Sequence, residues 1–283
     1  MSNPVTPQMV KQLRDRTDQP MGLCQKALVQ AAGDMDKAID WLRSQNKNMG
    51  AVREGNETAE GRIGVFIDAD KKVAAIVEMR CESAPSAKSD QFIALANDLA
   101  KHVAENKPAN VAEALTQKFG NGTVADRIND VVGVIREKMI LQRFQRLEGG
   151  NYGAYVHHDG TVGVLLECTG SGGAEVMRDV AAHAAALNPP YANIAAVPAE
   201  VVAKEKDLVK AEMDADPKSQ GKPANILEKI AEGKLKTRLA ETVLTEQQMA
   251  NGEKYPKMTV GAALQKAGLE VAKSVRFKVG GLS

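Results

Sequence analysis

The strongest constraint on the fold of this chain is a pattern that occurs twice, a hairpin of two strands followed by a helix. In the first copy, two β-prone stretches flank a turn at 68–71, and an apolar stripe at helical spacing follows over 89–105. In the second copy, two similar stretches flank a turn at Asp159-Gly160, and the helical pattern spans 174–187. This repetition indicates an internal duplication. It predicts a core of two similar halves, each with an antiparallel sheet and a helix.

The segments around the two copies complete the predicted core. Residues 110–147 read as helical, with a glycine stop at Gly149-Gly150. Farther along, a short helix is expected at 259–267, and 270–279 reads as a strand that completes the second sheet.

The second half of the core is interrupted by residues 198–239, which are rich in Lys, Glu and Ala. They read as two helices joined at 214–223, with apolar residues on each that can face the other in an antiparallel pair. These residues are Val201, Val202, Leu208, Val209 and Met213 on one arm, and Leu227, Ile230, Ala231 and Leu235 on the other. The segment therefore predicts a protruding helical hairpin, which could also mediate self-association.

Residues 1–46 read as three short helices. Thr6 is a candidate N-cap before Pro7, and Asp34 can cap the third helix after a stop at Gly33. Such a small module buries little core, so we expect it to serve as a docking element. Residues 47–60 have no apolar periodicity and are predicted to be an exposed linker.

These patterns together predict an α+β fold with five parts. The expected boundaries are a three-helix module at 1–46, a linker at 47–60, a first core half at 61–148, a second core half at 149–197 and 240–283, and an inserted helical hairpin at 198–239.

The composition narrows the classes of partner. The chain has 37 Lys and Arg against 36 Asp and Glu residues, and aromatic residues make up 4% of it, so direct contacts with nucleic acid are not expected. No stretch has the length and apolarity of a signal peptide or a bilayer span, which predicts a cytoplasmic protein without membrane contact. Cys24, Cys81 and Cys168 lie far apart, and we interpret them as small buried thiols.

No pattern in the sequence assembles a catalytic or cofactor site. The glycine-rich stretch at 169–175 lacks the spacing of the dinucleotide fingerprint and of the phosphate loop. His157 and His158 have no evident third metal ligand, and the acidic turn at 68–71 lacks the other ligands of a calcium loop. The sequence therefore predicts no cofactor and favours a protein that acts through its surfaces. A small-molecule enzyme remains a minor alternative.

Several segments resemble the translation elongation factor Ts family. The N-terminal string VKQLRDRTDQPMGLCQKALVQAAGDMDKAIDWLR resembles the opening of that family, with Leu-Arg-x-Arg-Thr before a Met-bearing turn and a Cys-x-Lys-Ala-Leu helix. QGKPANILEKIAEGKLKTRL resembles the second arm of the family's helical hairpin, and TVGAALQKAG followed by VRFKVG resembles its closing segment. The resemblance spans nearly the whole chain in the right order.

The resemblance implies a ubiquitin-associated-like N-terminal module, a two-part core and a helical hairpin. It also implies a guanine-nucleotide exchange factor that binds elongation factor Tu through the partner's nucleotide-binding domain and at least one further domain. Lys11, Arg14 and Met21 match family positions that contact the nucleotide-binding domain, and His157 matches a second contact. Without the resemblance, we would interpret Lys11 and Arg14 as residues of a solvent-exposed helix face. We would interpret His157 as a histidine bonded to the backbone of a turn.

The segment after Cys81 departs from the family. Its members usually carry Thr-Asp-Phe-Val there, and the Asp-Phe pair acts near the partner's magnesium ion, whereas this chain has Ser83-Ala84-Pro85-Ser86. The missing aromatic ring and carboxylate imply a weaker local displacement of the magnesium ion. The resemblance therefore leaves two functions open, promotion of GDP release or a diverged role that holds elongation factor Tu without efficient exchange.

Overall fold

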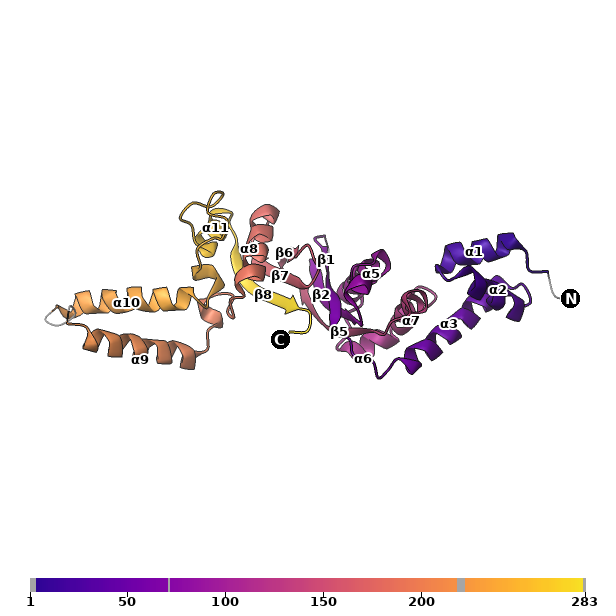
Figure 1. The fold of residues 1–283 in the computed structure, drawn as a ribbon. Coiled ribbons are helices and arrows are strands. Elements are labelled where there is room, and N and C mark those ends of the chain that lie inside the picture. Colours follow the sequence, from indigo (N-terminus) through magenta and orange to yellow (C-terminus); the bar gives the residue numbers. More distant parts are fainter. Residues whose placement is uncertain (1–3, 71, 218–221, 282–283) are drawn as a thin grey trace.

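The computed structural model describes residues 4–70, 72–217 and 222–281, and the molecule is elongated (Figure 1). A helical module lies at one end, a core of sheets and helices in the middle, and a pair of helices at the other end. The predicted α+β class, with N-terminal helices and antiparallel sheets, is confirmed.

The N-terminal module consists of α1 (Pro7–Thr17), α2 (Met21–Gln30) and α3 (Met35–Val52). The predicted caps are present. The Thr6 hydroxyl accepts a hydrogen bond from the Met9 N–H at 3.3 Å, and the Asp34 carboxylate accepts two N–H groups of the first turn of α3 at 3.1 Å each. A small apolar core joins the helices, formed by Val10, Leu13, Cys24, Ala27, Leu28, Ala31, Ala38 and Leu42.

Helix α3 extends farther than the sequence predicts. The segment 47–60 was expected to be an exposed linker, yet it is helical up to Val52. The reason is tertiary, because α3 packs along α7 (Val124–Ile135), where Gly50 lies close to the Asn129 side chain. Packing thus stabilises helix in a stretch with no apolar periodicity of its own.

Two three-stranded antiparallel sheets form the centre of the core. The first has the strand order β1-β2-β5 and the second the order β6-β7-β8. The strands are β1 (Glu60–Asp68), β2 (Val73–Cys81), β5 (Met139–Glu148), β6 (Asn151–Val156), β7 (Val162–Thr169) and β8 (Glu270–Lys278).

The two sheets pack face to face, and helices cover their outer faces. Ile63, Ile76 and Leu165 belong to the buried cluster between the sheets. Helices α5 (Asp90–Asn106) and α7 cover the first sheet, whereas α8 (Ala174–Leu187) and α11 (Val260–Lys266) cover the second. The core is therefore a four-layer arrangement of helix, sheet, sheet and helix.

The prediction of helix throughout 110–147 is wrong. This segment contains α6 (Val111–Thr116), the short strands β3 (Lys118–Phe119) and β4 (Gly122–Thr123), helix α7, and then strand β5. Helix α7 ends where Arg136 adopts a left-handed conformation with φ of 63°. Beyond it, Met139 and Leu141 are buried two residues apart, which is the period of a strand. Leu147 follows after a register shift and is buried on the other face, between the two sheets.

The helical hairpin consists of α9 (Ala199–Ala215) and α10 (Ala224–Ala240), flanked in the chain by the 3₁₀ helices η1 (Ile194–Ala196) and η2 (Leu244–Glu246). Arg238 of α10 pairs with two carboxylates of α9, Glu205 at 3.0 Å and Glu212. The hairpin projects from the core (Figure 1). Residues 218–221 of the predicted hinge lie outside the described residues.

The internal duplication extends to individual packing contacts. A Cβ on Gly64 of β1 would lie 2.4 Å from the Ala96 carbonyl oxygen of α5. A Cβ on Gly153 of β6 would lie 2.4 Å from the Met177 Cβ of α8. In each half of the core, a glycine in the first strand therefore leaves space for the close packing of the helix that covers that strand.

Candidate functional site

Residues 83–86 follow strand β2 and form the start of a short helix, α4 (Ala84–Ala87). Ser83 is the N-cap, because its hydroxyl accepts the Ser86 N–H at 3.4 Å. Pro85 suits the first helical turn, since its fixed φ and missing N–H cost nothing there. Pro85 is exposed while Ser86 is buried. The segment thus presents Pro85 to solvent on one turn of helix.

Hydrogen bonds on both sides hold this turn in place. The Ser83 N–H and hydroxyl both donate to the Glu137 carboxylate, at 3.0 and 2.6 Å. The adjacent Glu82 accepts from Arg53 at 3.2 Å and from Asn56 at 2.9 Å. Hydrogen bonding, chiefly from the Lys138 N–H, lowers the pKa of Glu82. These contacts tie α4 to the connection before β1 and to the start of β5.

Lys11, Arg14 and Met21 lie on the N-terminal module. Lys11 and Arg14 are exposed and three residues apart on α1, so their side chains are neighbours on one helix face. Met21 begins α2, and 52% of its surface is exposed. An exposed methionine and two exposed cations on the same module are groups that can contact an apolar and acidic partner.

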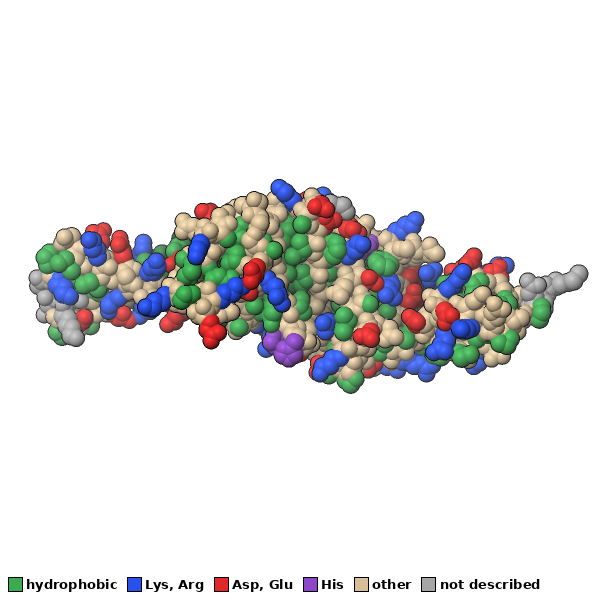
Figure 2. Space-filling view, turned by 90° about the horizontal axis from the view of Figure 1, so that it is seen from above, with side chains coloured by type: hydrophobic (Ala, Val, Ile, Leu, Met, Phe, Trp, Pro, Cys, Tyr) green, Lys and Arg blue, Asp and Glu red, His purple; other side chains and the backbone are tan. Residues whose placement is uncertain are grey.

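His157 lies in the turn between β6 and β7. Its Nδ1 is 3.1 Å from the Tyr155 hydroxyl, and its ring centroid is 4.2 Å from that of the exposed His158. Its backbone N–H donates to the Val162 carbonyl at 2.8 Å. A histidine patch is visible on the surface of the core (Figure 2). The ring is thus held by Tyr155 while remaining partly accessible.

The structure brings two of the predicted contact regions to one part of the core. Gly160 of the His157 turn accepts the Ile63 N–H of β1 at 2.8 Å, and residues 83–86 follow β2, whose Cys81 pairs with Glu60 of β1. The Lys11, Arg14 and Met21 surface belongs instead to the separate module at the end of the molecule (Figure 1).

Sequence reasoning missed the polar contact that fixes this module on the core. Gln19 and Asn46 are each only 1% exposed, and the Gln19 amide donates to the Asp130 carbonyl of α7 at 3.2 Å. Lys47 of α3 pairs with Asp126 at 2.9 Å. Burial raises the pKa of the nearby Asp130. The burial of Gln19 and Asn46 has no signal in the sequence, because both lie in polar stretches.

Neither a metal site nor a membrane-spanning helix is found among the residues that the structure describes. No group of three or more His, Cys, Asp or Glu side chains could hold a metal ion there, and no helix is long and apolar enough to cross a membrane. The three cysteines are free and buried, as predicted. Burial raises the pKa of both Cys81 and Cys168 to about 12, so neither is a reactive thiolate.

Comparisons with known proteins agree with this architecture. Residues 86–281 match the family described as Elongation factor TS. The chain is 39% identical over 280 residues to the Elongation factor Ts of Methylococcus capsulatus, covering 98% of this chain and 92% of that protein. It is 40% identical over 275 residues to that of Lactiplantibacillus plantarum, covering 96% and 90%, and 39% identical over 276 residues to that of Bordetella petrii, covering 98% and 91%.

Proposed function

Because the chain belongs to the elongation factor Ts family, we propose that it binds elongation factor Tu in its GDP form and promotes release of the GDP, so that GTP can rebind during protein synthesis. The observation that carries this proposal is the similarity over 98% of the chain to a relative of that name. The proposed role is that of an exchange factor in the cytoplasm, without chemical transformation of its own.

The proposed contacts come from two parts of the molecule. Lys11, Arg14 and Met21 form the surface of the module that contacts the nucleotide-binding domain of elongation factor Tu. Their exposure on one end of the molecule supports this assignment. His157 and residues 83–86 form a second surface, directed at the partner's magnesium and phosphate site. The buried Gln19 and Asn46 hold the module on the core, so both surfaces can engage one partner with little loss of conformational entropy.

The exchange mechanism is thermodynamic linkage. If this chain binds nucleotide-free elongation factor Tu more tightly than the GDP complex, it must weaken GDP binding by the same factor. Displacing the magnesium ion or turning the phosphate-binding loop removes charge compensation from the diphosphate, and GDP then dissociates faster.

The segment 83–86 favours a second candidate function. Ala84 and Pro85 supply neither a carboxylate nor an aromatic ring, and α4 is fixed by Ser83 and Glu137. If displacement of the magnesium ion depends on those missing groups, the chain would hold elongation factor Tu without accelerating exchange. We favour exchange, with the binding energy acting through the remaining contacts.

Affinity measurements test the proposal. Calorimetric titration of this chain into elongation factor Tu should give tighter binding to the nucleotide-free form than to the GDP form. Equal affinities would exclude exchange by linkage and favour the holding role, whereas no binding to either form would overturn both.

A further inference from the structure

The two halves of the core correspond at several individual residues. His102 of α5 and His183 of α8 are both buried, and each imidazole Nε2 lies 2.9 Å from a glutamine side chain. The guanidinium Nε of Arg146 in β5 donates to the α5 backbone at 2.8 Å, and that of Arg276 in β8 donates to the α8 backbone at 3.1 Å. Both central strands also carry a register shift directly after a glutamate.

That glutamate in the first half, Glu78 of β2, is buried and fully paired. Its carboxylate accepts the Arg143 Nε at 2.6 Å and the Gly280 N–H at 3.0 Å. Arg143 also lies over the Phe277 ring, with its guanidinium carbon 4.4 Å from the ring centroid. The Glu78 site thus binds a guanidinium group between a carboxylate and an aromatic ring.

The equivalent glutamate in the second half, Glu167 of β7, lacks these partners. Lys273 lies opposite it in the strand pairing, as Arg143 lies opposite Glu78. Lys273 is exposed, and within the described part of the chain the Glu167 carboxylate has neither an ion pair nor a hydrogen bond. The N–H of Gly150, which corresponds to Gly280, donates instead to the Tyr152 hydroxyl at 3.0 Å.

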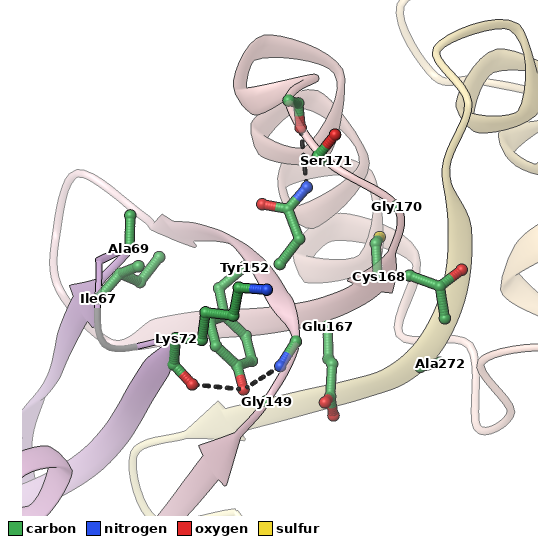
Figure 3. A pocket seen from close by; sticks show the side chains of 14 residues that line it. Ile67, Ala69, Lys72, Gly149, Tyr152, Glu167, Cys168, Gly170, Ser171 and Ala272 are labelled. Atoms are coloured by element: carbon green, nitrogen blue, oxygen red, sulfur yellow. Dashed lines mark hydrogen bonds between the residues drawn. The ribbon is translucent and has the colours of Figure 1, made fainter.

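An open cavity of about 510 Å³ adjoins Glu167. Figure 3 shows Glu167 and Lys72 lining it, with the Tyr152 ring between them. A Cβ on Gly150 would lie 2.7 Å from the Glu167 Oε1, so the glycine leaves room for the carboxylate. Glu167 and Tyr152 provide a carboxylate and an aromatic ring, the same two kinds of group that Glu78 and Phe277 provide around Arg143.

We propose that this cavity binds a guanidinium group, with Glu167 in the role that Glu78 has toward Arg143. A planar guanidinium can bond both carboxylate oxygens and stack on an aromatic ring, whereas an ammonium can do neither as well. Lys273 offers an ammonium from the neighbouring strand but forms no ion pair with Glu167, so the carboxylate is free to bind an external cation. Its source is either free arginine, whose carboxylate can pair with Lys72, or an arginine side chain of a polypeptide.

Calorimetric titration of the full chain tests this proposal with L-arginine, Nα-acetyl-L-arginine amide and L-lysine. We expect saturable 1:1 binding of at least one arginine compound, with lysine at least about tenfold weaker. Binding of free arginine only, abolished by Lys72→Gln, would identify the free amino acid as the source. Binding of the blocked compound as well would identify a polypeptide side chain.

Two substitutions distinguish binding at Glu167 from a general effect of surface charge. Glu167→Gln keeps the side-chain shape and should abolish binding, whereas Glu232→Gln, at an exposed position on α10, should leave it unchanged. Lys273→Arg should raise the melting temperature and weaken arginine binding, because the new guanidinium can fill the site from within the chain. Undiminished binding by Glu167→Gln, equal binding of lysine, or no saturable binding of either arginine compound would overturn the proposal.

Discussion

The Asn46 side chain of α3 lies directly on the backbone of Gly133 in α7, where a Cβ on the glycine would be 2.2 Å from the Asn46 Oδ1. This contact holds the N-terminal module against the core. The glycine allows this close approach of the two helices, because a side chain at 133 would overlap the buried Asn46.

Gly133→Ala should therefore loosen the module. Overpacking at a contact of this kind costs about 1–3 kcal/mol, and it should appear as a lower unfolding midpoint and faster amide hydrogen exchange in α3. Gly233→Ala is the matched control, because Gly233 is in α10 and a Cβ there meets nothing within 4 Å. It should stabilise by about 1 kcal/mol through helix propensity. A neutral or stabilising Gly133→Ala would contradict the packing described here.

Glu78→Gln should be strongly destabilising, since it leaves Arg143 and the Gly280 N–H around a neutral side chain in a nearly inaccessible site. Removing one partner of a buried ion pair typically lowers the free energy of unfolding by about 3–5 kcal/mol. Urea denaturation would measure this change. Glu148→Gln removes a half-exposed carboxylate that pairs with Lys107 and Arg146, and it should change the midpoint much less. Equal effects of the two substitutions would argue against a special role for Glu78.

Several features of the fold follow from sequence signals, but others depend on tertiary contacts. Thr6, Pro7 and Asp34 mark helix starts because capping is a local property. The helix prediction fails at strand β5 because the buried face of the strand changes at a register shift, so Leu141 and Leu147 lie on opposite faces and no single alternation marks the strand.

The candidate site was predictable to a different degree at each position. Exposure of Lys11 and Arg14 follows from the apolar stripe of α1, which places them on the other face. The helical turn at 83–86 depends on Glu137, which is distant in sequence and bonds Ser83. Likewise, nothing local distinguishes the buried Glu78 from a solvent-exposed strand glutamate, because its burial comes from the C-terminal segment that covers it.

The three cysteines should not react with a thiol reagent in the native chain at pH 8, because all are buried and burial raises the pKa of Cys81 and Cys168 to about 12. Unfolding in guanidinium should expose all three to rapid modification. Since these folded-state pKa values exceed the unfolded value of 9.0, their contribution to stability is present below pH 9 and declines as the pH rises from 9 toward 12. Rapid native-state modification at pH 8 would show that the thiols are accessible.

His183 should remain neutral in the folded chain below the usual imidazole pKa of 6.5. Burial lowers its pKa, while the hydrogen bond with Gln247 acts in the opposite direction. Because the unfolded state binds the proton more readily, the contribution of His183 to stability is present above pH 6.5 and is lost as the pH falls through the folded-state pKa. An NMR titration of the imidazole checks this, and a native midpoint above 6.5 would contradict it.

The release of fluorescent GDP from elongation factor Tu, followed by stopped flow in excess unlabelled nucleotide, tests the central claim most directly. We expect this chain to accelerate release, the combined Lys11→Ala and Arg14→Ala variant to accelerate it less, and Ala84→Asp with Pro85→Phe to accelerate it more. Those results would establish exchange through the surfaces described here. No acceleration by the unaltered chain, under conditions where it binds elongation factor Tu, would contradict the exchange function and favour the holding role.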